Sequence, residues 1–237
     1  MSLLEVAGLT AGHGLLVACQ NISFTLDSGD VLALVGANGA GKTTLLRCLA
    51  GSHRPSQGQI RFAGADISGL PAHRRTAQGI ALVPEGRRLF TDMTVLENLQ
   101  IARAAKRTGD WDLATVLDAL PQLKSILTRR AGQISGGQQQ ATAIGRALMT
   151  NPRLLLLDEL SLGLSPIAVE GVYAVLPRLI EAGMAIILVE QDLRRAMATA
   201  HRLICMLEGQ ILLQGPSASL TREAVTAAYF GLSRQAA

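Results

Sequence analysis

Short, continuously apolar runs alternate along the chain with segments of helical periodicity. Four of these runs have the length expected of strands buried on both faces: Val31–Val35, Ile80–Val83, Leu154–Leu157 and Ala185–Val189. Leu45, Leu46 and Leu49 fall on one side of a predicted helix over Lys42–Ala50. Because strands and helices alternate in this way, the pattern predicts an α/β fold.

Residues 92–149 change the pattern to a mostly helical one. Thr94 and Glu97 have the spacing of a capping box, and Leu113, Val116 and Leu120 repeat at helical spacing. A longer helix is expected over residues 137–149. We therefore predict one domain over residues 1–237, with a core of residues 1–91 and 150–237 and a helical subdomain at about 92–149.

The apolar periodicity is weaker towards the two ends of the core than in its middle. Residues 3–35 predict short strands, and residues 221–231 predict a terminal helix. Another helix is expected over residues 167–182, but Pro177 lies inside it. An interior proline removes a backbone donor and costs about 3 kcal/mol, so we expect this helix to be kinked or broken.

The composition narrows the class of protein. The chain is 49% hydrophobic, 17% charged and 3% aromatic, which is enough apolar material for a large core and excludes disorder. No apolar run approaches the roughly 18 residues of a transmembrane helix, and the N-terminus lacks the pattern of a signal peptide. The net charge of +4 is spread along the chain, so no nucleic-acid partner is expected, and the 3 cysteines lack metal-site spacing, which favours a reducing compartment.

A glycine-rich segment follows the strand at Val31–Val35 and opens the helix at Lys42. It fits the phosphate-loop pattern G-x-x-x-x-G-K-[ST]. Such a loop wraps backbone N–H groups around phosphate oxygens, and the helix N-terminus adds its positive dipole end. We predict that ATP is held by Gly36, Asn38, Gly39, Ala40, Gly41, Lys42, Thr43 and Thr44.

Two carboxylates follow the strand at Leu154–Leu157. The Thr43 hydroxyl and the Asp158 carboxylate are hard oxygen ligands of the kind that suits Mg²⁺. Glu159 is placed to polarise an attacking water as a general base, with Lys42 on the β- and γ-phosphates. An acidic pair that simply ends a strand at the surface is the alternative interpretation.

A second anion-binding segment stands far from the first in the sequence. Ser135, Gly136, Gly137 and Gln138 begin the helix expected over 137–149. Since one ATP needs only one phosphate loop, this segment suggests contact with the γ-phosphate of a nucleotide held by another subunit. Taken alone, Ser-Gly-Gly would be read as a flexible helix cap.

Three motifs follow one another along the chain: the phosphate loop at 36–44, the segment 135–138 and the strand with its two carboxylates at 154–159. In this order they resemble the motifs of the ATP-binding subunit of an ABC transporter, and the resemblance extends over residues 4–231. The resemblance implies a P-loop NTPase core with an N-terminal antiparallel β-subdomain and the inserted α-helical subdomain. Segments such as Val83-Pro84-Glu85-Gly86-Arg87-Arg88 and Leu188-Val189-Glu190-Gln191 are similar to the shorter ATPase of branched-chain amino acid importers. In that branch Glu85 would stand at the Q-loop, in a catalytic and metal-binding position, and Gln191 at the switch position.

Two positions depart from the wider family. The aromatic residue expected to stack on adenine is replaced by His13, and the proline expected after the catalytic glutamate is Leu160, which is expected to loosen the turn after Glu159.

The resemblance also implies partners and a location. A second ABC ATPase subunit, either identical or different, would pair with this chain, and two membrane permease subunits would contact the Glu85–Phe90 segment. A periplasmic or extracellular solute-binding protein would act indirectly, and the chain would lie peripherally at the cytoplasmic face of the bacterial inner membrane.

Three other functions stay open from the sequence. They are the same role in a urea, amide or other amino-acid importer, a catalytically weakened regulatory module, and a soluble ABC ATPase acting on DNA or ribosomes. Intact Lys42, Thr43, Asp158 and Glu159 argue against the second. The single cassette with its short helical insertion argues against the third.

Overall fold

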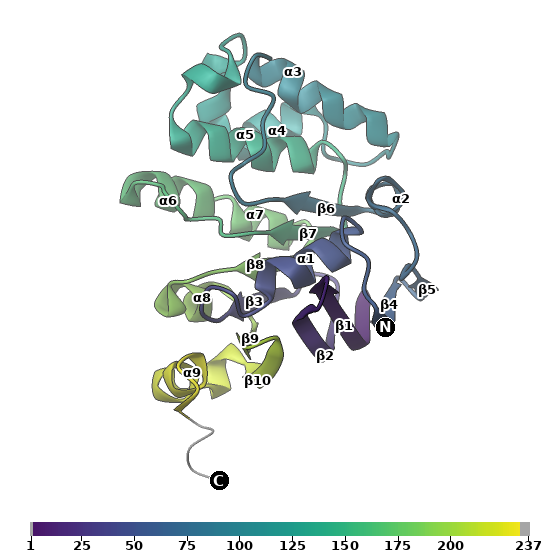
Figure 1. Ribbon diagram of the computed structural model, residues 1–237. Helices are drawn as coiled ribbons and strands as arrows, with labels where there is room; N and C mark the ends of the chain where they lie inside the picture. The colour runs from purple at the N-terminus through teal and green to yellow at the C-terminus, as the bar shows by residue number, and fades with distance from the viewer. Residues whose placement is uncertain (1, 233–237) are drawn as a thin grey trace.

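A six-stranded sheet forms the centre of the molecule (Figure 1). The computed structural model describes residues 2–232. The strand order is β10 (Gln210–Pro216), β9 (Arg202–Leu207), β3 (Val31–Val35), β8 (Ala185–Val189), β7 (Leu154–Leu157) and β6 (Ile80–Val83). All neighbours are parallel except β10, which is antiparallel to β9. The four apolar runs are therefore adjacent strands of this sheet, three of them central and β6 at its edge, whereas β9 and β10 were not predicted.

A smaller antiparallel sheet packs beside the first. Its order is β2 (Leu16–Leu26), β1 (Leu4–His13), β4 (Gln57–Phe62) and β5 (Ala65–Asp66). The prediction of short strands over residues 3–35 is wrong for β1 and β2, which are 10 and 11 residues long. Their pairing is interrupted by register shifts, and such irregularities break the strict apolar alternation by which a long strand is recognised in a sequence.

Alternate residues of the central strands supply two separate cores. Val31, Ala33 and Val35 pack on one face of β3, and Leu32 and Leu34 pack on the other, because successive side chains of a strand point in opposite directions. The second face carries α1 (Lys42–Ala50) and the small sheet. The first face carries the helices that follow β6, β7 and β8.

The segment between β6 and β7 is mostly helical (Figure 1, top). It contains α3 (Val95–Gln100), η1 (Ile101–Ala105), α4 (Leu113–Ala119), η2 (Pro121–Ile126), η3 (Ala131–Gln133) and α5 (Gly136–Leu148). The predicted capping box at the start of α3 is confirmed, since Thr94 Oγ1 accepts from the Glu97 amide at 3.2 Å and Glu97 Oε2 accepts from the Thr94 amide at 2.7 Å.

Pro177 breaks its helix as expected. The break separates α6 (Pro166–Tyr173) from α7 (Leu176–Glu181), and Pro177 stands in the first turn of α7, where a proline lacks no hydrogen bond. The other helical elements are α2 (Ala72–Gln78), α8 (Leu193–Thr199), η4 (Ser217–Ser219) and α9 (Arg222–Tyr229). Over residues 2–232, none of the helices has the length and apolar character needed to cross a membrane.

Candidate functional site

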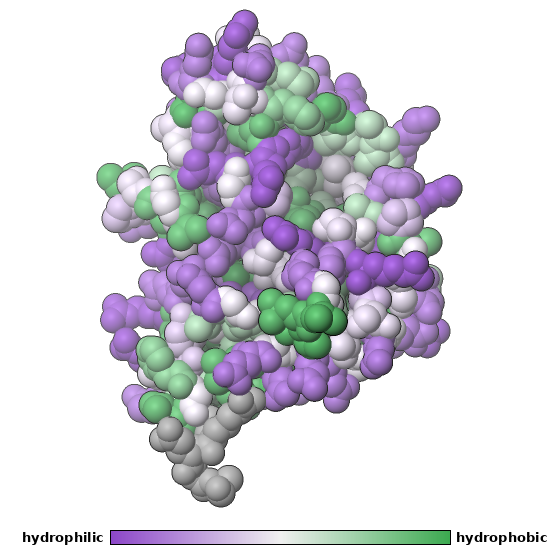
Figure 2. Space-filling view, viewed as in Figure 1, coloured by the Kyte–Doolittle hydropathy of each residue, from purple (hydrophilic) through white to green (hydrophobic). Residues whose placement is uncertain are grey.

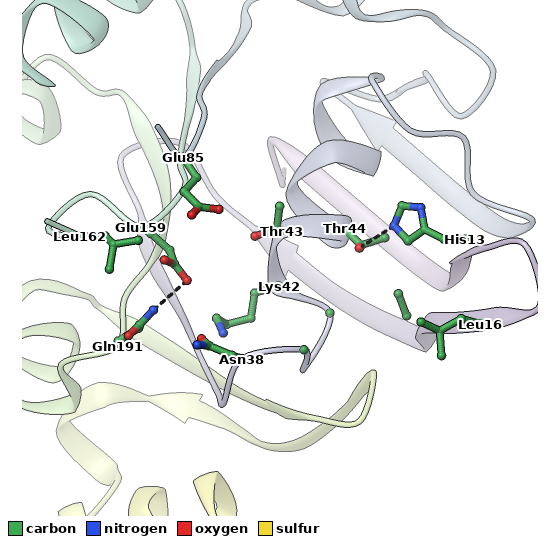
Figure 3. Close-up of a pocket in the computed structure, with 13 residues that line it drawn as sticks. His13, Leu16, Asn38, Lys42, Thr43, Thr44, Glu85, Glu159, Leu162 and Gln191 are labelled. Carbon is green, nitrogen blue, oxygen red and sulfur yellow. Dashed lines mark hydrogen bonds between the residues drawn. The ribbon is translucent and has the colours of Figure 1, made fainter. Parts of the chain in front are cut away.

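A pocket of about 490 Å³ opens at the carboxyl ends of β3, β7 and β8. The small sheet supplies one wall, the loop between β3 and α1 the floor, and the segments after β6, β7 and β8 the opposite wall (Figure 3). The lining residues are His13, Leu16, Ala18, Asn38, Gly39, Gly41, Lys42, Thr43, Thr44, Glu85, Glu159, Leu162 and Gln191. Residues from 13 to 191 thus meet at a single site, which is where parallel α/β sheets bind ligands.

The loop from Gly36 to Thr44 can only take its shape with glycine at key positions. The φ angles of Gly36, Gly39 and Gly41 are 150°, 83° and 98°. A Cβ atom on Gly36 would collide with the Met206 carbonyl oxygen, and one on Gly41 with the Ala18 carbonyl oxygen. The close approach of this loop to β2 and β9 therefore requires glycine. Ala40 is buried behind the loop, so its side chain faces the protein interior and not the pocket.

Lys42 points back into the loop. Its Nζ donates hydrogen bonds to the Gly36 and Ala37 carbonyl oxygens at 2.7 and 2.9 Å, and the residue is only 4% exposed. Burial lowers the pKa of Lys42, while the nearby carboxylates of Glu159 and Asp158 raise it. The structure thus holds a cation at the centre of a loop rich in backbone N–H groups, an arrangement that favours phosphate.

Thr43 and Asp158 meet beside Lys42. Thr43 Oγ1 donates to Asp158 Oδ1 at 3.1 Å, and Asp158 is 3% exposed. Burial raises the pKa of Asp158, the Thr43 hydrogen bond lowers it, and the charges of Glu159 and Glu85 raise it further. A divalent cation would relieve this crowding of negative charge.

The donor set fits Mg²⁺ better than a metal bound by protein alone. No group of three or more His, Cys, Asp or Glu side chains suited to a metal occurs in residues 2–232. Mg²⁺ usually takes one or two protein oxygens and completes its shell with water and substrate phosphates. The hydroxyl of Thr43 and the carboxylate of Asp158 match that requirement, and Glu85 lines the same pocket.

Glu159 faces Gln191 across the pocket wall (Figure 3). Gln191 Nε2 donates to Glu159 Oε1 at 2.9 Å. Glu159 has a φ of 50°, a left-handed conformation that is strained for a residue other than glycine. Leu160 is fully buried in the core, so its packing anchors the turn that the sequence led us to expect would be loosened.

His13 lies at the opposite end of the pocket from Glu159 (Figure 3). Its Nε2 is 3.3 Å from Thr44 Oγ1, and its ring centroid is 4.6 Å from that of His53. Leu16 lies near it (Figure 3) and is 71% exposed, and its neighbours Leu15 and Val17 are 104% and 55% exposed. Figure 2 shows a compact apolar patch on this part of the surface. This end of the pocket offers an apolar edge and an imidazole face, which suits a flat base.

Sequence reasoning missed three of the lining residues, namely Leu16, Ala18 and Leu162. Nothing near Leu16 or Ala18 in the sequence carries a polar motif; they reach the pocket because the β1–β2 hairpin folds back over the phosphate loop. The available signal was the apolar run Leu15-Leu16-Val17, whose members are 104%, 71% and 55% exposed.

The segment Ser135–Gln138 lies apart from this pocket. Ser135 caps α5, because its Oγ accepts from the Gln138 amide at 3.3 Å and its amide donates to Gln138 Oε1 at 3.0 Å. Ser135, Gly137 and Gln138 line a second hollow of about 360 Å³ with residues of α6. None of the residues 135–138 lines the first pocket, so the structure of one chain does not bring the two phosphate-binding segments together.

Comparison with known proteins agrees with this geometry. Residues 19–161 match the family model described as ABC transporter. The chain is 41% identical to the high-affinity branched-chain amino acid transport ATP-binding protein BraG of Pseudomonas aeruginosa, covering 92% of this chain and 95% of that protein. It is 33% identical to the probable branched-chain amino acid transport ATP-binding protein LivF of Archaeoglobus fulgidus, covering 92% and 94%.

Solved structures show the same fold. The crystal structure of a nucleotide-free ATP-binding cassette from an ABC transporter superposes with a TM-score of 0.84 at 26% identity, covering 96% of this chain and 95% of that one. A second crystal structure, of the ADP conformation of an ATP-binding cassette of an ABC transporter, superposes with a TM-score of 0.83 at 26% identity, covering 97% of this chain and 95% of that one. The chain therefore belongs to the ABC transporter family, as an ATP-binding cassette that hydrolyses ATP to power transport.

Proposed function

We propose that this chain is the ATP-hydrolysing subunit of an importer of branched-chain amino acids. The similarity to BraG carries the proposal, because it extends over 92% of this chain and 95% of that protein. Glu85 and Gln191 support it, since both line the nucleotide pocket at the positions where the resemblance implies glutamate and glutamine for this branch.

Different residues at the pocket bind ATP, hold the metal ion and take part in hydrolysis. The phosphate loop and Lys42 bind the phosphates, and Thr43, Asp158 and Glu85 would hold Mg²⁺ through oxygen ligands. When bound, Mg²⁺ neutralises charge on the phosphate oxygens. Glu159 accepts a proton from the attacking water, and Gln191 keeps the Glu159 carboxylate in place through their 2.9 Å hydrogen bond. His13 and Leu16 receive the adenine at the other end of the pocket.

A second ATPase subunit completes the site. None of the residues 135–138 lines the pocket of its own chain, and Ser135, Gly137 and Gln138 line a separate hollow. The amide groups at the start of α5 would therefore serve the γ-phosphate of ATP on the partner, which is either a second copy or a different ATPase. The partner's own segment would close this chain's pocket in return.

The surface around Phe90 fits a membrane permease. Phe90 is 51% exposed, and the Arg146 guanidinium lies 5.9 Å from its ring centroid. Arg146 also lines a groove of about 230 Å³ between α2, η1 and α5, in which Ile101 is 43% exposed. A cytoplasmic helix of a permease subunit would dock here, and the chain would then lie at the cytoplasmic face of the membrane, with the solute-binding protein on the other side.

Arg87 and Arg88 differ in the structure, although the sequence gives them the same expected role. Arg87 turns inward, where its Nη1 donates to Gln139 Oε1 at 2.9 Å and its carbonyl accepts from Arg146 Nη2 at 3.1 Å. Arg88 is exposed. Arg88 is therefore the residue to substitute in a test of permease coupling.

We expect Arg88→Glu to reduce solute transport by the assembled complex about 10-fold, because a reversed charge opposes docking of the permease helix. ATP affinity of the isolated chain should stay within about 2-fold of the unaltered value, since Arg88 does not line the pocket. Arg222→Glu, at an exposed arginine at the start of α9, is the matched control. Transport at the unaltered rate in Arg88→Glu would remove this surface from the permease interface.

The solute is tested by reconstituting this ATPase with the permeases and binding protein of its own system. Uptake of leucine, isoleucine and valine is compared with uptake of urea, in the presence of ATP inside the vesicles. Saturable uptake of the branched-chain amino acids alone supports the proposal. Uptake of urea without leucine would assign the chain to an amide importer and overturn it.

A further inference from the structure

Two hydrogen bonds cross side by side from the turn after β7 to the turn after β8. The first joins Gln191 Nε2 to Glu159 Oε1 at 2.9 Å. The second joins the Ser161 hydroxyl to the Glu190 carboxylate, at 2.8 Å to Oε1 and 3.0 Å to Oε2. Because Glu190 and Gln191 are consecutive, and Ser161 follows Glu159 by two residues, the second bond fixes the segments that carry the first.

The second bond joins a half-buried hydroxyl to a buried carboxylate. Glu190 is only 1% exposed, and its amide donates to the Leu34 carbonyl oxygen of β3 at 3.2 Å. Burial raises the pKa of Glu190, while the Ser161 hydrogen bond and the Arg195 charge lower it. A buried carboxylate destabilises a fold unless it is hydrogen-bonded, and an apolar side chain would fill the same space at less cost. The presence of a carboxylate at this position is therefore better explained by the residues that its hydrogen bond keeps in place.

The Ser161–Glu190 hydrogen bond lies next to Glu159, whose backbone is strained. Glu159 has a φ of 50°, a left-handed conformation that is strained for a residue other than glycine. Such a conformation persists only where the surroundings determine it. Before Glu159, the Asp158 amide donates to the Val83 carbonyl oxygen at 3.0 Å; after it, Leu160 is fully buried and Ser161 is bound to Glu190. On the C-terminal side the Ser161–Glu190 bond is thus a polar anchor, together with the Leu162 amide, which donates to the Glu159 carbonyl oxygen at 3.2 Å.

We propose that Ser161 and Glu190 are positioning residues, which hold the Glu159 carboxylate and Gln191 in register for attack on ATP by water. This inference rests on the proposed role of Glu159 as general base. It assigns a function to two residues that do not line the pocket.

The test measures kcat and KM for MgATP in Ser161→Ala, Ser161→Thr and Glu190→Met. We expect Ser161→Ala and Glu190→Met each to lower kcat about 10-fold with KM within about 2-fold, because misplacing a reacting group affects the chemical step. Ser161→Thr keeps the hydroxyl and should retain most of the rate. The double variant Ser161→Ala/Glu190→Met should be no slower than either single variant by more than about 2-fold, since both substitutions remove the same hydrogen bond.

The same Ser161→Ala change is then made in Glu159→Gln, with single-turnover hydrolysis and ATP binding as readouts. If Ser161 acts through Glu159, it should alter the residual rate by less than about 2-fold in that background. An equal loss in both backgrounds, or a change confined to KM, would overturn the positioning role while leaving Glu159 as the base. A Glu159→Gln variant with the full rate would instead remove the base assignment, and the inference with it. A retained thermal transition and ATP affinity in Glu190→Met separate positioning from misfolding.

Discussion

Glu159→Gln is expected to hydrolyse MgATP about 100-fold or more slowly than the unaltered chain, because removal of a general base typically costs 10²–10⁴ in rate. Glutamine keeps the size of the side chain and an oxygen that can accept from Gln191, so the hydrogen bond of 2.9 Å has a substitute. What is lost is the capacity to take a proton. Steady-state release of phosphate under saturating MgATP measures the effect.

ATP binding should be nearly unchanged in the same variant. Glu159 lies on the pocket wall that faces the small sheet (Figure 3). It is a carboxylate near an anionic substrate, so its neutralisation does not weaken binding. Glu181→Gln is the matched control, since Glu181 ends α7 at an exposed position away from the pocket. Equal rates for Glu159→Gln and the unaltered chain would exclude Glu159 as the base and leave the attacking water to another residue.

The central strands were predictable from the sequence because they are buried on both faces. Leu154–Leu157 and Ala185–Val189 need no polar side chain anywhere, so their apolar runs stand out. The outer strands are different: β10 is partly exposed along most of its length and mixes Gln210, Gln214 and Gly215 with apolar residues. Its place in the sheet depends on pairing with β9, and such pairing leaves no local pattern.

The phosphate loop and the Asp158–Glu159 pair were candidates from the sequence because their chemistry is local. Consecutive residues make the loop, and a strand ending in carboxylates marks its neighbour. Leu16 and Leu162 were not candidates, since they line the pocket only through the position of a hairpin and of a turn. The hydrogen bond from Ser161 to Glu190 joins residues 29 apart in sequence, and no periodicity or motif encodes it.

Lys42 is the residue whose loss should affect nucleotide binding most. Among residues 2–232 it is the one lysine that lines the pocket, and its Nζ donates hydrogen bonds to the Gly36 and Ala37 carbonyl oxygens of the loop. Both carbonyl contacts hold the ammonium group inside the loop before any phosphate arrives, so little conformational entropy is left to lose on binding. Burial already lowers the pKa of Lys42, and a bound polyphosphate would oppose that effect and favour the charged form.

We expect Lys42→Ala to weaken MgATP binding about 100-fold or more, because charge-assisted hydrogen bonds from Lys42 to the β- and γ-phosphates, at about 1.5–3 kcal/mol each, are lost. Hydrolysis should fall below detection at ATP concentrations that saturate the unaltered chain. Lys124→Ala is the matched control: its Nζ also makes a short bond, 2.7 Å to Asp118, but at a side chain that is 55% exposed, where such a pair contributes about 0–1 kcal/mol. Titration with a fluorescent ATP analogue measures affinity, and a thermal melt without nucleotide checks that the loop carbonyls left behind have not unfolded the chain. An unchanged affinity in a folded Lys42→Ala variant would contradict the assignment of this loop as the phosphate site.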